Sequence, residues 1–272
     1  MKNILCPTDF SSTSLDAIAY AAKLAQVTHS ELTLLNVQSL FDVTPVEILT
    51  GKQYSIKATT DRLHAQCREV GKVYKIVCTA EVEPTYRKLS AVIRDKADHF
   101  DLVVMGSNGP DDLYQFFWGT NTYNALAKSR TPLLLIPESY LYGEIKHVLY
   151  AFDYLRERKL PIGPLQNFVK TLNGEVTVLQ VMEEAYSKKA DEDLKELQFI
   201  LQTRQPDDFP LKYTTIRSDD VAGSINQYIL EKKPDLLALC SQNRNFIESM
   251  YHKSVIKDIS TICDYPVFVF RE

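Results

Sequence analysis

The sequence predicts an α/β protein built from two repeats, each a five-stranded parallel β-sheet with helices on both faces. Three observations lead to this fold class. The chain has 272 residues, enough for two domains of ordinary size. Several sequence blocks recur in the same order in the two halves. Short runs of Ile, Leu and Val alternate with stretches of helical periodicity, which is typical of parallel sheets covered on both sides.

The repeat consists of four pairs of matching blocks. KNILCPTD and KHVLYAFD, and likewise LTLLNVQ and VTVLQVM, are 144 positions apart, whereas DLVVMGSN and DLLALCSQ, and TPLLLIP and YPVFVFR, are 134 apart. One change of offset by ten residues therefore explains all four pairs. The short polar and aromatic stretch 138–144 separates the repeats, so we expect domains at 1–139 and 144–272.

In the first repeat, strands are expected at 2–8, 31–38, 73–82, 101–106 and 132–136. Ser11 or Ser12 can cap the first helix, which would turn Leu15, Ile18, Ala22 and Ala25 toward the core. Further helices are expected at about 54–70, from Pro84 to Phe100, and at 119–129; Pro84 would occupy a first-turn position. In the second repeat, strands are expected near 146–152, 175–182, 211–217, 235–240 and 266–270.

Composition excludes several classes of protein. A formal charge of −4 and a pI of about 5.8 give no general attraction to nucleic acid or to an anionic membrane. We see no signal peptide and no apolar run long enough to span a bilayer. The five cysteines are odd in number and lack a CxxC pair, which favours reduced thiols and a cytoplasmic location.

Candidate binding residues follow two strands of the first repeat. In an open parallel sheet, ligands bind beyond the carboxyl ends of the strands. Pro7, Thr8 and Asp9 follow the first strand, and Met105 and Gly106 open the segment after the fourth. Gly109 lies three residues beyond Gly106, and Gly119, Thr120 and Asn121 begin a helix after nine more residues. Glycines allow close approach of the backbone, and a helix N-terminus suits phosphate.

The first repeat resembles the universal stress protein family in its PTDFS start, GSNG loop, GTN segment and TPLLLIP strand. The ATP-binding members of that family share a G-2x-G-9x-G-(S/T) motif. The resemblance implies a Rossmann-like, adenine nucleotide alpha hydrolase-like fold with strand order 3-2-1-4-5 in each repeat. It places Asp9 and the backbone around Val37 by the adenine and ribose. It places Gly106, Asn108, Gly109, Gly119, Thr120 and Asn121 around the phosphates, with Pro7, Thr8 and Met105 shaping the wall.

Some residues depart from the family pattern. Asn108 stands where many members have His or Arg, and Asp111 and Asp112 would repel phosphate unless a divalent cation such as Mg²⁺ bridges them. In the second repeat, Cys240, Asn243 and Lys253 replace the three glycines. Their side chains should block close backbone approach, so we expect no nucleotide in that repeat.

The resemblance implies a stress-response protein that binds ATP or another adenine nucleotide and acts through its conformation or an unidentified protein partner. The alternative is a nucleotide-free interaction scaffold with a vestigial loop. No catalytic nucleophile–base set is evident, so we expect at most slow ATP hydrolysis. His64 and Cys67 share a helix face but lack a second ligand pair, so no metal site is predicted. The resemblance further implies an internal pseudo-dimer through the last strands, and leaves a homodimer open.

Overall fold

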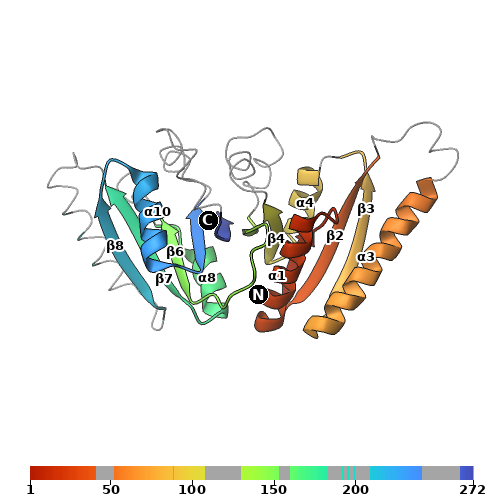
Figure 1. Ribbon diagram of the computed structural model, residues 1–272, viewed down its shortest axis with the longest axis horizontal. Helices are drawn as coiled ribbons and strands as arrows, with labels where there is room; N and C mark the ends of the chain where they lie inside the picture. The colour runs from red at the N-terminus through yellow and green to blue at the C-terminus, as the bar shows by residue number, and fades with distance from the viewer. Residues whose placement is uncertain are drawn as a thin grey trace. The chain divides into compact units, whose positions relative to one another are not determined.

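The computed structural model describes residues 1–40, 52–87, 89–107, 130–152, 160–182, 209–240 and 264–271, together with 192, 195 and 199. The chain divides into two compact units, with the main division between Tyr142 and Gly143. Figure 1 labels the helices and strands of both units. The main division lies within the stretch 138–144 that separates the repeated blocks; the domain bounds 1–139 and 144–272 stay a prediction. Each unit is an α/β structure with a parallel sheet, which confirms the predicted fold class.

The sheet of the first unit has the order β3-β2-β1-β4-β5. Its strands are β1 (Asn3–Pro7), β2 (Glu31–Ser39), β3 (Cys78–Thr85), β4 (Leu102–Ser107) and β5 (Leu133–Pro137). All the strand pairs recorded within this unit are parallel. The Ile, Leu and Val runs of the inner strands are buried because helices cover both faces of such a sheet.

Three helices of the first unit are described: α1 (Ser12–Thr28), α3 (Lys52–Tyr74) and α4 (Leu89–Ala97). Ser11 caps α1, as predicted, because its Oγ accepts a hydrogen bond from the Ser14 amide at 3.2 Å. Most of the buried residues of α1 are small, including Ala17, Ala21 and Ala25, which lets the helix lie close to the strands. Ile18, Ala22 and Ala25 are buried as expected, but Leu15 is 42% exposed, so the prediction for that residue was wrong.

The region around Pro84 corrects a second prediction. Pro84 does not begin a helix; it lies in β3, level with Gln38 of β2, and α4 begins only at Leu89. β3 also starts at Cys78 rather than at residue 73, because α3 continues to Tyr74. A proline is tolerated here because β3 is an edge strand of this unit's sheet, where one side needs no backbone donor. The helix predicted at 119–129 lies outside the described residues.

The second unit has a parallel sheet of order β10-β9-β6-β7-β8. Its strands are β6 (His147–Ala151), β7 (Glu175–Met182), β8 (Leu211–Arg217), β9 (Leu236–Cys240) and β10 (Val267–Phe270), and each agrees with its predicted range to within one residue. The helices described in this unit are α8 (Gly163–Thr171) and α10 (Val221–Lys232). In chain order the strands of both units are thus arranged as 3-2-1-4-5.

A carboxylate anchors the first strand in the same way in both units. Asp101 Oδ2 accepts hydrogen bonds from the amides of Lys2 and Asn3, and Asp235 Oδ2 accepts them from Lys146 and His147. The two aspartates are 134 positions apart, and the amides they hold are 144 apart, which are the two offsets of the repeated blocks. The shared contact is strong structural support for duplication.

Among the helices that the structure describes, none is long and apolar enough to cross a bilayer.

Candidate functional site

The site residues that the structure describes, Pro7, Thr8, Asp9, Val37, Met105 and Gly106, lie on or directly after strands β1, β2 and β4 toward the carboxyl edge of the first sheet. β1 and β4 are parallel neighbours with Leu5 level with Val103. The same register carried onward places Pro7 level with Met105 and Thr8 level with Gly106. Val37 lies on β2, two residues beyond the partner of Pro7. Asn108, Gly109, Gly119, Thr120 and Asn121 lie outside the described residues.

The turn from β1 into α1 is held by hydrogen bonds centred on Thr8. The buried Thr8 side chain lies 3.0 Å, oxygen to oxygen, from the Ser14 hydroxyl and accepts from the Phe10 amide, also at 3.0 Å. The Thr8 carbonyl accepts from Asn36 Nδ2 at 2.7 Å. Asn36 is therefore a supporting residue that the sequence analysis missed, although a buried amide inside the apolar run of β2 was a signal for it. The turn is fixed independently of any ligand.

Asp9 lies exposed at the tip of this turn. Its Oδ1 accepts a hydrogen bond from the Ser11 amide at 2.9 Å, so the carboxylate supports the start of α1. Partial burial acts to raise the pKa of Asp9, but hydrogen bonds from Ser11 and Ser14 outweigh it and bring the pKa below its ordinary value. Asp9 is consequently an anion at neutral pH. Helix-start support is therefore observed; nucleotide contact by the same side chain stays a prediction.

Gly106 is required by packing. A Cβ placed on Gly106 would lie 2.6 Å from both the carbonyl oxygen and Cγ2 of Thr13, in the first turn of α1. This distance is far inside van der Waals contact, and the carbonyl belongs to the backbone, which cannot simply rotate away. Glycine at 106 thus lets α1 approach β4, and this requirement was not apparent from the sequence.

A positive charge reaches this region from α3. The Arg62 guanidinium carbon lies 4.0 Å from the centroid of the Phe10 ring, a cation–π contact. Phe10 follows Asp9 directly and has a left-handed backbone, with φ of 65°. No local pattern could have revealed the pair, because its members lie 52 positions apart in the sequence.

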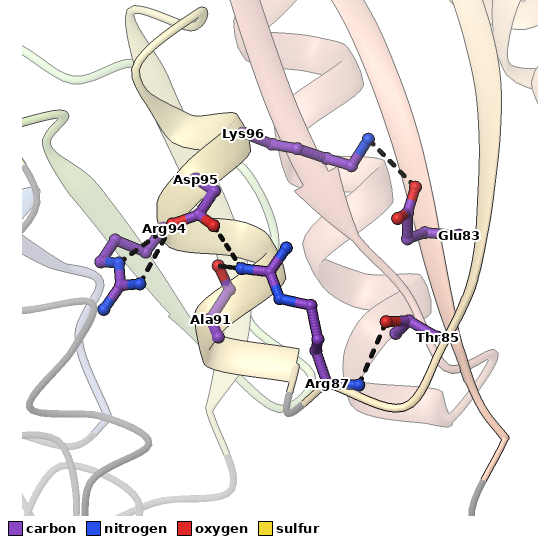
Figure 2. Close-up of polar contacts among 7 residues, drawn as sticks. All are labelled: Glu83, Thr85, Arg87, Ala91, Arg94, Asp95 and Lys96. Carbon is purple, nitrogen blue, oxygen red and sulfur yellow. Dashed lines mark hydrogen bonds and ion pairs between the residues drawn. The ribbon is translucent and has the colours of Figure 1, made fainter.

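The charged groups beyond β3 are already paired. Figure 2 shows the Arg87 side chain turned toward α4, where it bonds Asp95 and the Ala91 carbonyl. Arg94 also contacts Asp95, at 3.1 Å, and Lys96 pairs with Glu83 across to β3 at 3.4 Å. Arg87, Arg94 and Asp95 are about half exposed, so their ion pairs add little stability. Arg87 and Arg94 are nevertheless both paired with Asp95.

Aromatic residues fill the corresponding end of the second unit. By the repeat offsets, Tyr150 and Phe152 stand where the first unit has Cys6 and Thr8, and Phe270 stands where it has Ile136. All three aromatic residues are essentially inaccessible to solvent, and the Tyr150 ring lies 5.4 Å from each of the two phenylalanine rings, centroid to centroid. The Tyr150 hydroxyl donates to the Pro161 carbonyl at 2.9 Å. The space next to β6 is therefore occupied by side chains.

The counterpart of Gly106 is the buried Cys240, as predicted from the repeat. Asn243 and Lys253 lie outside the described residues. Within the described ranges of both units, no cluster of three or more His, Cys, Asp or Glu side chains could hold a metal.

Comparisons with known proteins agree with this architecture. A curated relative, a universal stress protein of Methanocaldococcus jannaschii, is 25% identical over 152 residues, which are 50% of this chain and 94% of the relative. A universal stress protein from Archaeoglobus fulgidus is similar in fold over 99% of this chain and 96% of its own, with a TM-score of 0.66 and 15% identity. A functionally unknown protein from Pseudomonas aeruginosa is similar over 100% of this chain and 92% of its own, with a TM-score of 0.59 and 14% identity.

Both structural likenesses extend over the two units and show the fold alone. The family assignment comes from a sequence model described as the universal stress protein family, which matches residues 1–137. This match includes the whole first sheet and covers just over half of the chain. The protein therefore belongs to the universal stress protein family.

Proposed function

We propose that the first unit binds ATP or another adenine nucleotide at the carboxyl ends of β1 and β4, and that binding controls the protein's conformation or its association with a partner in a stress response. One observation carries the proposal. The Thr8–Asp9 turn directly follows β1, and Gly106 lies near the end of the neighbouring parallel strand β4, at the edge where the glycine motif of the family begins. Sheet edges of this kind hold nucleotides in α/β proteins.

The proposed roles follow the chemistry of the residues. Asp9 is an exposed anion that can accept hydrogen bonds from an adenine amine or a ribose hydroxyl. Val37 and Met105 are partly exposed and lie at the edge where an adenine could pack. We assign the phosphates to Asn108, Gly109, Gly119, Thr120 and Asn121, whose main-chain amides would supply the donors. Mg²⁺ would offset the charges of Asp111 and Asp112.

The proposal includes an asymmetry between the units. Phe152 replaces the small Thr8 and is fully buried against Tyr150, so a ligand at that edge would have to displace packed aromatic rings. Opening such a site would cost several kcal/mol, roughly the 3–5 kcal/mol of removing a buried phenylalanine. We therefore expect one nucleotide per chain.

Isothermal titration calorimetry with ATP and with AMP, each with and without Mg²⁺, tests the proposal. We expect a stoichiometry of one, and ATP to gain more from Mg²⁺ than AMP does. Gly109→Trp should abolish binding because an indole would occupy the phosphate position. Asn243→Trp, at the equivalent place in the second unit, is the matched control and should bind normally. Equal binding by Gly109→Trp, or loss of binding in Asn243→Trp alone, would show that the site is misplaced.

A second candidate function is a nucleotide-free interaction scaffold in the cytoplasm. The observation that favours it is that Gly106 and Asp9 each have a structural role, one against Thr13 and one at the start of α1. Both residues would be needed without a ligand. Absence of heat with every adenine nucleotide, at protein concentrations that detect a Kd of about 1 mM, would favour the scaffold. A steady-state phosphate-release assay would reveal slow hydrolysis, for which we expect no more than trace turnover.

A further inference from the structure

We propose that Cys67 and Cys78 form a redox-active dithiol, which a peroxide converts into a disulfide between α3 and β3. The proposal concerns a different part of the first unit from the nucleotide site and does not depend on nucleotide binding.

The two cysteines come from elements that pack on each other. Cys67 lies on the sheet-facing side of α3, in line with the buried Leu63 and Val70. Its Sγ donates to the Thr79 carbonyl of β3 at 3.0 Å. Cys78 is the first residue of β3 and directly precedes Thr79. The sulfur of Cys67 therefore already contacts the strand that carries Cys78.

Cys78 in turn lies against α3. A Cβ placed on Gly71, one helical turn after Cys67, would lie 3.7 Å from the Cβ of Cys78. Residues four apart share a helix face, so Cys67 and Gly71 both face the start of β3. The absence of a side chain at Gly71 leaves Cys78 close to the helix backbone. A rotation of the two side chains, with the helix and strand held in place, is the movement we expect to close the bond.

Hydrogen bonding between the thiols makes the two cysteines chemically unequal. The interaction with Cys78 lowers the pKa of Cys67. The same interaction raises the pKa of Cys78, with further contributions from burial and from the charges of Cys67 and Cys6. The thiolate is the nucleophilic form of cysteine, so Cys67 is the residue that attacks and Cys78 the one that resolves.

Access distinguishes this pair from the other thiol on the same face of the sheet. β3 is an edge strand of the first unit's sheet, and Cys78 is partly exposed there. Cys6 lies on the inner strand β1 with no exposed surface, and burial raises its pKa strongly. Cys67 itself is only 4% exposed, so we expect a small peroxide to reach its sulfur from this edge, past Cys78, whereas Cys6 on the inner strand should stay reduced.

The proposed reaction has two balanced steps. The Cys67 thiolate attacks one oxygen of hydrogen peroxide, the O–O bond breaks, and with one proton the products are a Cys67 sulfenic acid and water. The Cys78 sulfur then attacks the Cys67 sulfur; the S–O bond breaks and the hydroxyl group leaves with the Cys78 proton as water. Two thiols lose two electrons in total, and one peroxide is reduced to two waters.

Peptide mapping of the full-length protein after treatment with hydrogen peroxide tests the proposal. Arg68, Lys72 and Lys75 lie between the cysteines, so trypsin separates peptide 63–68 from peptide 76–87. Without reductant we expect these two peptides as one cross-linked species, lighter than their sum by two hydrogen atoms. Dithiothreitol should restore both. Intact-protein mass should show that the cross-link is intramolecular.

Variants separate the two roles. In Cys78→Ser, dimedone should label a sulfenic acid on Cys67, since the resolving thiol is missing. In Cys67→Ser, Cys78 should stay unlabelled. Cys6→Ala is the matched control and should cross-link as the wild type does. Circular dichroism confirms that each variant is folded, and the wild-type peptide map does not depend on any variant.

Three results would overturn the proposal. They are oxidation of Cys67 and Cys78 only to separate sulfinic acids, a cross-link that joins either residue to a different cysteine, and persistence of both free thiols after all exposed thiols have reacted.

Discussion

At the residue scale, the missing side chain of Gly106 determines how closely α1 packs on the end of β4. The carbonyl of Thr13 lies where a side chain at 106 would begin, so α1 and β4 are closer than two side-chain-bearing elements could be. The second unit carries the buried Cys240 at the equivalent position. In the first unit α1 begins five residues past the end of β1, and Gly106 leaves room for its first turn.

Gly106→Ala should lower the free energy of unfolding by about 1–3 kcal/mol, because overpacking forces the backbone of α1 to shift. Urea denaturation measures this loss as a lower midpoint at an unchanged slope. Gly143→Ala is the control, since a Cβ there would have no atom within 4 Å, and it should leave the midpoint nearly unchanged. Thr13→Ser should not rescue Gly106→Ala, because the clash with the carbonyl oxygen remains. Equal midpoints for the two alanine variants would contradict the packing role.

At the scale of elements, the start of β1 is fastened to the turn before β4 through Asp101. The carboxylate accepts hydrogen bonds from two backbone amides. Without it, these amides at the amino-terminal end of β1 would be left to solvent. Partial burial acts to raise the pKa of Asp101, but hydrogen bonds from Lys2 and Asn3 and the nearby amino terminus outweigh it and lower the pKa. A depressed folded-state pKa means that ionised Asp101 stabilises the fold above its unfolded-state pKa, and that this contribution is lost as pH falls through the folded-state value.

Asp101→Asn should therefore be less stable than the wild type at pH 7, by about 0.5–1 kcal/mol after solvent screening. The difference should shrink below about pH 4, where the wild-type carboxylate also loses its charge. Thermal unfolding of both proteins from pH 7 to pH 3 measures it. Asp98→Asn, at an exposed position three residues earlier, provides the comparison for a general surface-charge effect. A difference that stays constant with pH would show that Asp101 acts by shape and not by charge.

How far the elements could be predicted depends on how strongly each one is buried. Inner strands such as β1 and β9 are continuous apolar runs, so their bounds follow from the sequence to within about a residue. β3 is half-exposed and contains Pro84, whose preference for a helix start was a misleading signal at an edge strand. Leu15 fits the helical period but lies beside the sheet-facing residues, where α1 is exposed.

The place of the candidate residues in the sheet could be predicted from the sequence, but their contacts could not. Strand ends and glycine spacing indicated where Asp9 and Gly106 would meet, and the structure brings these strand ends together. The contacts of Thr13, Asn36 and Arg62 depend on how far apart elements lie once folded, which spacing along the chain does not encode.

At the scale of the whole molecule, the two units share one arrangement of strands but differ in the side chains that pack against the sheet. Both units keep the strand order and the aspartate anchor. The first unit packs alanines of α1 against its sheet, whereas the second packs phenylalanines, with Phe168 of α8 stacked on Phe268 at 4.5 Å between centroids. A single binding edge per chain is the consequence we propose.

The resemblance to the family also implies that the last strands of the two units meet as an internal pseudo-dimer. If that is so, an isolated first unit would keep an unpaired, wholly apolar edge at β5, since β5 is the last strand in its order and reads LLLIP. Unpaired apolar edges drive association. We therefore expect residues 1–139 alone to form a symmetric dimer through β5, and residues 144–272 to do so through β10. Sedimentation velocity over a range of concentrations measures this, with the full-length chain as reference. A strictly monomeric, folded 1–139 fragment would contradict pairing through the last strands, because that edge would then be stable in solvent without a partner.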